Sequence, residues 1–218
     1  MSAGILSHLF QGGVRGGPKL QSKCYMEKRV IIVHGWSGHP QEGWLSWLRG
    51  RLEEQGDVVE TPEMPHPDKP VISTWVQKLS EIIREPDENL ILVGHSIGCQ
   101  TILRYLASLP SNAKLAGVVL VAPWAFISGL SDEDKIIAEP WLKNMPGYPD
   151  VDRHLLRKPY AIFSDNDPYV PLEDNVKFFK DRYGAEIFVE NGRGHFTEDD
   201  GVEELPSALE AVKKISTH

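Results

Sequence analysis

The chain has 218 residues, of which 41% are hydrophobic and 25% charged, a composition typical of a globular domain that buries its own core. Acidic residues outnumber basic ones by 31 to 23, and the resulting net charge of -8 argues against a nucleic-acid partner, which would need a positive field. No apolar run approaches the roughly 20 residues of a membrane helix, so no membrane partner is expected either.

The first segment differs from the rest of the chain. Met1–Met26 contains no Asp or Glu but carries Arg15, Lys19 and Lys23. An organelle-targeting leader would be basic and acid-poor in this way, and that interpretation stays open. The glycine pairs of the segment favour a flexible tail, because paired glycines cost a helix too much backbone entropy. We therefore expect a flexible leader over residues 1–27 and a single domain over residues 28–218.

Cysteine usage indicates the compartment. The chain has two cysteines, Cys24 and Cys99, which do not make a disulfide framework. Few cysteines without such a framework favour a reducing compartment, so a cytoplasmic location is expected.

Strand-like and helix-like segments alternate from Lys28 onward. Apolar or β-branched runs predict strands, and apolar residues recurring every three or four positions predict helices. In chain order these are Arg29–His34 (strand), Glu42–Gln55 (helix), Asp57–Glu60 (strand), Ile72–Ile83 (helix), Asn89–Gly94 (strand), Ile97–Leu109 (helix), Gly117–Ala122 and Tyr160–Ser164 (strands), Leu172–Tyr183 (helix), Ala185–Glu190 (strand) and Leu205–Ile215 (helix). This alternation predicts an α/β fold, a parallel sheet with helices on both faces. Ligands of such sheets bind beyond the carboxyl ends of the strands.

A candidate nucleophile stands directly between a predicted strand and a predicted helix. The sequence Gly94-His95-Ser96-Ile97-Gly98 matches the pattern G-x-S-x-G. In that setting the sharp turn exposes the serine hydroxyl, and the two glycines remove Cβ atoms that would collide. We interpret Ser96 as a nucleophile; a turn with a capping serine is the plainer alternative.

A serine nucleophile needs a base, and the base needs a carboxylate that fixes its tautomer. Asp165 and Asp167 both follow the Tyr160–Ser164 strand, in a turn-like segment. Asp167 is the preferred acid because it lies further past the strand end, and Asp165 stays open as the alternative. His195, in the loop before the last helix, is the expected base, since it completes the chain order Ser, Asp, His.

The oxyanion of an acyl-transfer reaction needs backbone donors. We expect the N–H groups of Ile97 and Trp36 to supply them, the second from the loop that follows the first strand. His34 could instead bind a metal together with His39 and His66, but their spacing matches no standard zinc pattern. No metal or other cofactor is therefore expected.

These motifs together resemble the small serine hydrolases of the retinoblastoma-binding protein 9-like family, within the α/β-hydrolase superfamily. The matching pieces are HGWSGHPQEGWLSWL, PEMPHPDKP, GHSIG, DNDPYVP and GRGHF. The resemblance implies a minimal α/β-hydrolase fold of about six parallel strands, and it implies Asp167 as the acid. The family name comes from an interaction through an L-x-C-x-E segment, which this sequence lacks. A protein partner is therefore not carried over, although one stays open.

The expected activity is cleavage of small carboxylic ester or amide bonds through an acyl-enzyme, falling on acidification as His195 takes up a proton. The alternative is a non-catalytic protein-interaction module that retains the fold. A short cap is expected over residues 123–158, where Trp124, Phe126 and Trp141 either line a substrate pocket, together with His34, or anchor the segment to the core.

Overall fold

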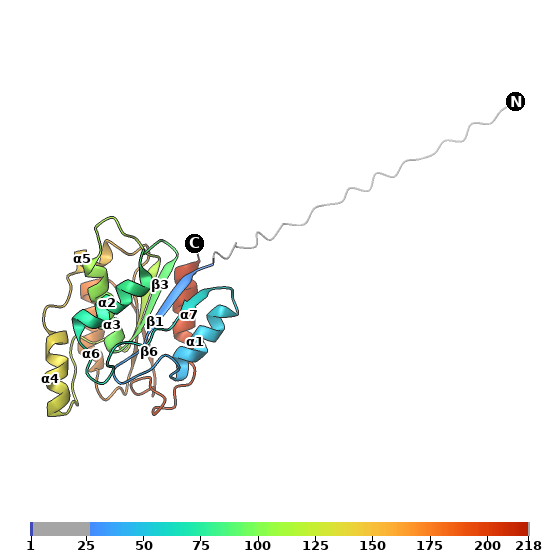
Figure 1. Ribbon diagram of the computed structural model, residues 1–218. Helices are drawn as coiled ribbons and strands as arrows, with labels where there is room; N and C mark the ends of the chain where they lie inside the picture. The colour runs from blue at the N-terminus through green and yellow to red at the C-terminus, as the bar shows by residue number, and fades with distance from the viewer. Residues whose placement is uncertain (2–26, 218) are drawn as a thin grey trace.

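The computed structural model describes Met1 and residues 27–217 (Figure 1). The leader expected over residues 1–27, with Cys24, lies almost wholly outside the described residues. In the described part of the chain, no helix is both long and apolar enough to cross a membrane.

Six parallel strands form one sheet, in the order β2-β1-β3-β4-β5-β6. The strands are β1 (Arg29–Val33), β2 (Val58–Glu60), β3 (Leu90–His95), β4 (Gly117–Val121), β5 (Tyr160–Ser164) and β6 (Glu186–Glu190). Every residue of β3, β4 and β5 is buried, because helices cover both faces of the sheet; the edge strands β2 and β6 are partly exposed. The predicted α/β fold with about six parallel strands is confirmed.

Helices cover the two faces in two groups (Figure 1). One face is covered by α1 (Gly43–Glu53) and α7 (Pro206–Ser216), and the other by α2 (Ile72–Ile83), α3 (Ile97–Ser108) and α6 (Leu172–Tyr183). A separate hydrophobic cluster fills the space on each side of the sheet. This two-layered core holds the strands rigidly, and with them the loops that follow their carboxyl ends.

Two further helices lie between β4 and β5, in the segment for which the sequence predicts a cap. Helix α4 (Asp132–Leu142) is capped at its N-terminus by Ser131, whose hydroxyl accepts a hydrogen bond from the backbone N–H of Asp134 at 3.1 Å. Helix α5 is a single turn (Tyr148–Asp152). Figure 1 shows α4 at the flank of the domain, in yellow. Neither helix is predicted by the periodicity of the sequence.

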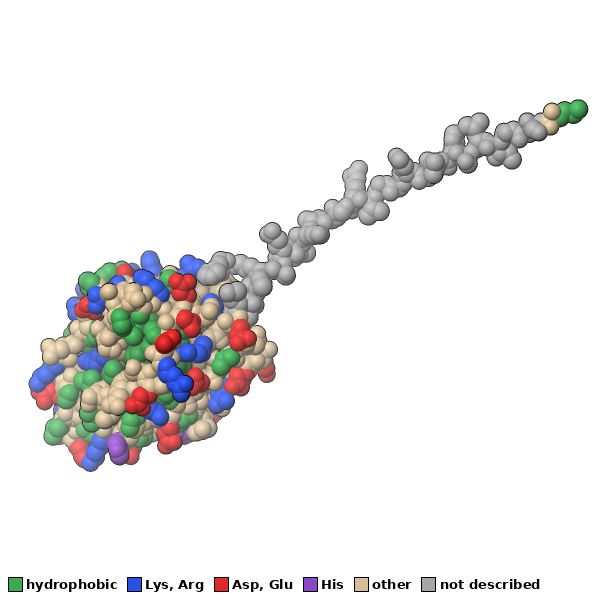
Figure 2. Space-filling view, turned by 45° about the horizontal axis from the view of Figure 1, so that its top comes forward, with side chains coloured by type: hydrophobic (Ala, Val, Ile, Leu, Met, Phe, Trp, Pro, Cys, Tyr) green, Lys and Arg blue, Asp and Glu red, His purple; other side chains and the backbone are tan. Residues whose placement is uncertain are grey.

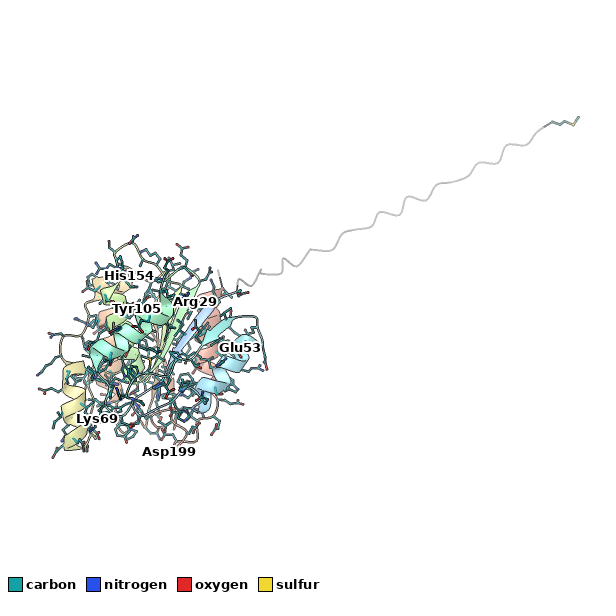
Figure 3. The ribbon with its side chains drawn as sticks, in the orientation of Figure 1. Arg29, Glu53, Lys69, Tyr105, His154 and Asp199 are labelled. Carbon is teal, nitrogen blue, oxygen red and sulfur yellow. The ribbon has the colours of Figure 1, made fainter. Side chains whose placement is uncertain are left out.

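The carboxyl ends of the strands share one end of the molecule (Figure 3). Lys69 and Asp199, which lie in loops after β2 and β6, mark that end. Arg29, at the start of β1, and His154, just before β5, mark the opposite end. The candidate residues Ser96, Asp167 and His195 all follow carboxyl ends of strands, so the topology brings their loops together.

Candidate active site

The backbone turns sharply at Ser96. Strand β3 ends at His95, helix α3 begins at Ile97, and Ser96 between them has φ 50° and ψ -115°. A positive φ is uncommon for a residue with a side chain and costs about 1–3 kcal/mol, so the surrounding structure must impose it. The backbone N–H of Ser96 is anchored by the carbonyl of Val121 at 2.9 Å, at the end of the neighbouring strand β4. The strain therefore lies at the residue predicted to be the nucleophile.

The two glycines around Ser96 allow this turn to pack closely. A Cβ atom at Gly94 would lie 2.7 Å from the backbone nitrogen of Cys99. A Cβ atom at Gly98 would overlap the carbonyl oxygen of Val33 and lie 2.8 Å from that of His34. Both obstacles are backbone, so α3 could not keep its place against the ends of β1 and β3 if these residues had side chains.

We expect Gly98→Ala to lower the free energy of unfolding by about 1–3 kcal/mol, because the added methyl must push α3 away from β1. The matched control is Gly50→Ala in α1, where an added Cβ meets nothing within 4 Å. That change should stabilise the chain by about 0.5–1 kcal/mol, since alanine loses less backbone entropy in a helix. Urea unfolding of both variants measures the difference; equal stabilisation would contradict the close contact at Gly98.

His195 bridges the other two candidate residues. Its Nε2 lies 2.9 Å from Oγ of Ser96, and its Nδ1 lies 2.7 Å from Oδ2 of Asp167. The side chains are secluded, with 13% of His195 and 2% of Asp167 exposed. Because an ionised carboxylate can only accept hydrogen bonds, Nδ1 carries the proton and Nε2 is free to accept one from Ser96. Three side chains from distant loops thus form one hydrogen-bonded chain.

The two candidate acids have different partners. Oδ1 of Asp167 accepts the backbone N–H groups of Tyr169 at 2.8 Å and Val170 at 3.1 Å, which aims the second oxygen at His195. Oδ1 of Asp165 accepts the backbone N–H of Gly192 at 2.8 Å. The structure therefore places Asp167 against the imidazole, while Asp165 holds the loop that precedes it.

His34 holds the loop after β1 rather than facing solvent. Its Nε2 accepts the backbone N–H of Met64 at 3.0 Å, so Nδ1 carries the ring proton and donates to the carbonyl of Gly35 at 2.8 Å. Burial lowers the pKa of His34, which keeps the ring neutral. The carbonyl of Gly35 and the N–H of Trp36 belong to one planar trans peptide and point in opposite directions. Fixing the carbonyl therefore fixes the direction of the Trp36 N–H.

Comparison with known proteins identifies the family of this chain. The model of the family described as serine hydrolase matches residues 30–214. The chain belongs to this serine hydrolase family. A relative from Bacillus subtilis, named "Putative hydrolase YdeN", is 31% identical over 86% of this chain and 95% of its own length. The serine hydrolase RBBP9 of Rattus norvegicus is 28% identical over 87% of this chain and 96% of its own length. The family expected from the sequence motifs is therefore confirmed.

Solved structures show the same fold. The ydeN gene product of B. subtilis superimposes with a TM-score of 0.78 at 28% identity, covering 86% of this chain and 98% of its own. Est1E from Butyrivibrio proteoclasticus shares the fold alone, with a TM-score of 0.64 at 16% identity over 88% of this chain and 89% of its own. This serine hydrolase is thus an enzyme of the hydrolase class with an α/β-hydrolase architecture.

The geometry gives no support to the pocket expected from the aromatic residues of the cap. Trp124 and Trp141 are completely buried in the core, so they anchor the segment and present no surface to a substrate. Phe126 is 47% exposed, but it lines a separate hollow of about 880 Å³ together with Tyr148 and α6. His34 is buried with both ring nitrogens engaged. Position along the chain could not distinguish an aromatic wall from an aromatic anchor.

The residues that the structure describes include no group of three or more His, Cys, Asp or Glu side chains able to hold a metal ion. His34, His39 and His66 are therefore not brought together as a metal site. Two further polar residues, which no sequence motif predicted, contact the backbone of His195.

Those two residues hold the backbone of His195. Oδ2 of Asp200 accepts the backbone N–H of His195 at 2.8 Å, and Nε2 of His95 lies 2.8 Å from the carbonyl oxygen of His195. For His95 a signal was present, because it directly precedes the nucleophile. Asp200 carried none, since acidic residues are common in exposed turns.

Proposed function

We propose that this hydrolase cleaves small carboxylic ester or amide bonds, with Ser96 as nucleophile, His195 as general base and Asp167 as the residue that orients His195. The observation that carries the proposal is the continuous hydrogen-bonded chain from Asp167 through His195 to Ser96. Family membership and the three hydrogen-bonded side chains both favour an enzyme over the non-catalytic interaction module.

In the proposed reaction, Oγ of Ser96 attacks the acyl carbon while its proton passes to Nε2 of His195. The imidazolium that forms keeps its Nδ1–H on Asp167, so the carboxylate stabilises the charge where it develops. His195 then returns the proton to the leaving group, and a water that His195 deprotonates hydrolyses the acyl-enzyme. No cofactor is part of this sequence of steps.

The oxyanion of the tetrahedral intermediate is assigned to the backbone N–H groups of Ile97 and Trp36. Ile97 is the first residue of α3, so its N–H lies at a helix terminus that favours negative charge. His34 fixes the peptide that carries the Trp36 N–H. Among the described residues, neither N–H donates a hydrogen bond to a backbone carbonyl in a turn or loop. Both can therefore donate to a substrate, which supports the assignment.

The burial of the candidate nucleophile argues for a small substrate. Ser96 is 5% exposed, and the aromatic residues of the cap segment are either buried in the core or placed at another hollow. Access to the hydroxyl is therefore narrow. The aromatic residues of the cap segment form no apolar wall that a long acyl chain could contact.

The substrate proposal predicts an order of rates. Among p-nitrophenyl esters, kcat/KM should be highest for acetate or butyrate and should fall by about tenfold or more for decanoate. The long acyl chain of decanoate clashes with the residues around Ser96 and gains no apolar contact that would offset the clash. Initial rates of release of p-nitrophenol measure this order. A higher kcat/KM for decanoate than for acetate would contradict the narrow site.

We propose a cytoplasmic location and a small-molecule substrate. The free and buried thiol of Cys99 supports the location, because thiols stay reduced in the cytoplasm. Figure 2 shows Lys, Arg, Asp and Glu side chains interspersed over the face in view, which favours a small-molecule substrate over nucleic acid.

A further inference from the structure

The loop that carries His195 is fixed at successive peptide groups. Oδ1 of Asn166 accepts the N–H of Gly194 at 2.8 Å, and Oδ2 of Asp200 accepts the N–H of His195. Nε1 of Trp44 donates to the carbonyl of Phe196 at 3.0 Å. Between these groups lies the carbonyl of His195, which faces Nε2 of His95 at 2.8 Å. The backbone of His195 is therefore fixed both at its N–H and at its carbonyl.

His95 differs from the other partners of this loop because it is the covalent neighbour of Ser96. It is the last residue of β3, its side chain is buried, and its ring lies 5.2 Å from the ring of His195 at an interplanar angle of 44°. One residue thus joins the backbone of the nucleophile to the backbone of the base. The 2.9 Å distance between Oγ of Ser96 and Nε2 of His195 depends on these two backbones keeping their relative position.

The surroundings of His95 select one tautomer. A carbonyl oxygen can only accept, so Nε2 carries the proton and donates to His195. Nδ1 is buried without a hydrogen-bond partner among the described residues, and a Cβ atom at Gly35 would lie 2.8 Å from it. The rings of Trp44 and His95 form a T-shaped pair, with their centroids 5.9 Å apart. Burial lowers the pKa of His95 to about 3, so the ring stays a neutral donor near neutral pH.

We propose that His95 is a positioning residue for the hydrolytic reaction: its Nε2–H holds the carbonyl of His195 and so keeps the base within reach of Ser96. This inference rests on the proposed roles of Ser96 and His195. Reactions in which a base must meet a nucleophile lose rate steeply when the groups move apart by about 1 Å. The hydrogen bond from His95 to the His195 carbonyl should therefore raise kcat. It should leave KM nearly unchanged, because it does not contact the substrate.

The test compares two variants of His95 whose amide side chains differ in length. In His95→Gln the side-chain nitrogen can occupy the place of Nε2 and donate to the His195 carbonyl. In His95→Asn it stands nearer the backbone, at the place of Nδ1, and falls short of that carbonyl. We expect His95→Asn to lower kcat for p-nitrophenyl acetate by about tenfold, the equivalent of one lost hydrogen bond, with little change in KM. His95→Gln should recover most of that rate.

A buried histidine at the other end of the molecule supplies the control. His154 is completely buried, and its Nδ1 lies 3.0 Å from the carbonyl of Ala113, at the end opposite the site (Figure 3). His154→Asn should lower the melting temperature, because the smaller side chain leaves a cavity in a buried place, but it should leave kcat unchanged. If His154→Asn fails to fold, the comparison of His95→Gln with His95→Asn still decides.

Each outcome points to one conclusion. A wild-type kcat in a folded His95→Asn would overturn the positioning role, and so would an equal loss in the Gln and Asn variants, because the loss would then not follow the hydrogen bond. If wild-type protein neither turns over the ester nor reacts with a fluorophosphonate, the proposed function itself has failed, which is a different result from either of these.

Discussion

Replacing Ser96 with alanine should abolish labelling by a fluorophosphonate and lower ester turnover by about 10⁴-fold or more. The physical reason is that the reagent and the ester both need an oxygen nucleophile at the strained turn between β3 and α3. Alanine keeps the Cβ, so the backbone at φ 50° meets no new atom and the fold should persist. Gel fluorescence after labelling, together with single-turnover kinetics, measures the loss.

A serine at the far end of helix α3 provides the matched control for this experiment. Ser108 lies at the opposite end of α3, where its hydroxyl donates to the carbonyl of Tyr105 at 2.7 Å. Ser108→Ala should label and turn over as the wild type does. Equal labelling of wild type and Ser96→Ala would mean that the reagent reacts elsewhere, and the assignment of Ser96 as nucleophile would be wrong.

Local patterns were enough to predict the sheet and its main helices. Strands such as Leu90–His95 contain continuous apolar runs, here Leu90–Val93, because both of their faces are covered, and that burial is visible in the sequence itself. Helix α4 escaped prediction for the converse reason. It buries only Ala138 and Trp141, and Pro140 stands inside it, so its apolar residues make no regular helical stripe. Its signal is instead the Ser131 cap followed by acidic residues in the first turn.

The candidate site shows the same division between local and distant information. The turn at Ser96 could be predicted because a strand, two glycines and a helix are consecutive in the chain. The choice between Asp165 and Asp167 could not be made firmly, because both lie in one turn and only the direction of each carboxylate separates them. Contacts such as that of Asp200 with the His195 N–H form only once the loops have met, and no spacing in the sequence encodes them.

Asp167→Asn should lower kcat for p-nitrophenyl acetate by about 10⁴-fold while leaving the fold intact. The asparagine oxygen can keep the two bonds from the Tyr169 and Val170 N–H groups, which turns the amide nitrogen toward Nδ1 of His195. An amide nitrogen donates, so Nδ1 must become the acceptor and the ring proton moves to Nε2. In that tautomer Nε2 cannot take the proton of Ser96, and the nucleophile is no longer activated.

Asp165→Asn is the matched control, because the same chemical change is made two residues away. The asparagine oxygen can still accept the N–H of Gly192, so the loop before His195 should keep its place and kcat should stay close to that of the wild type. Steady-state kinetics of the two variants, with circular dichroism to establish that both fold, distinguishes the two acids. The reverse pattern, with Asp165→Asn inactive and Asp167→Asn active, would transfer the role to Asp165. It would also require the 192–195 loop to rearrange in solution, because the Asp165 carboxylate binds the backbone of Gly192 and Asp167 lies against the imidazole.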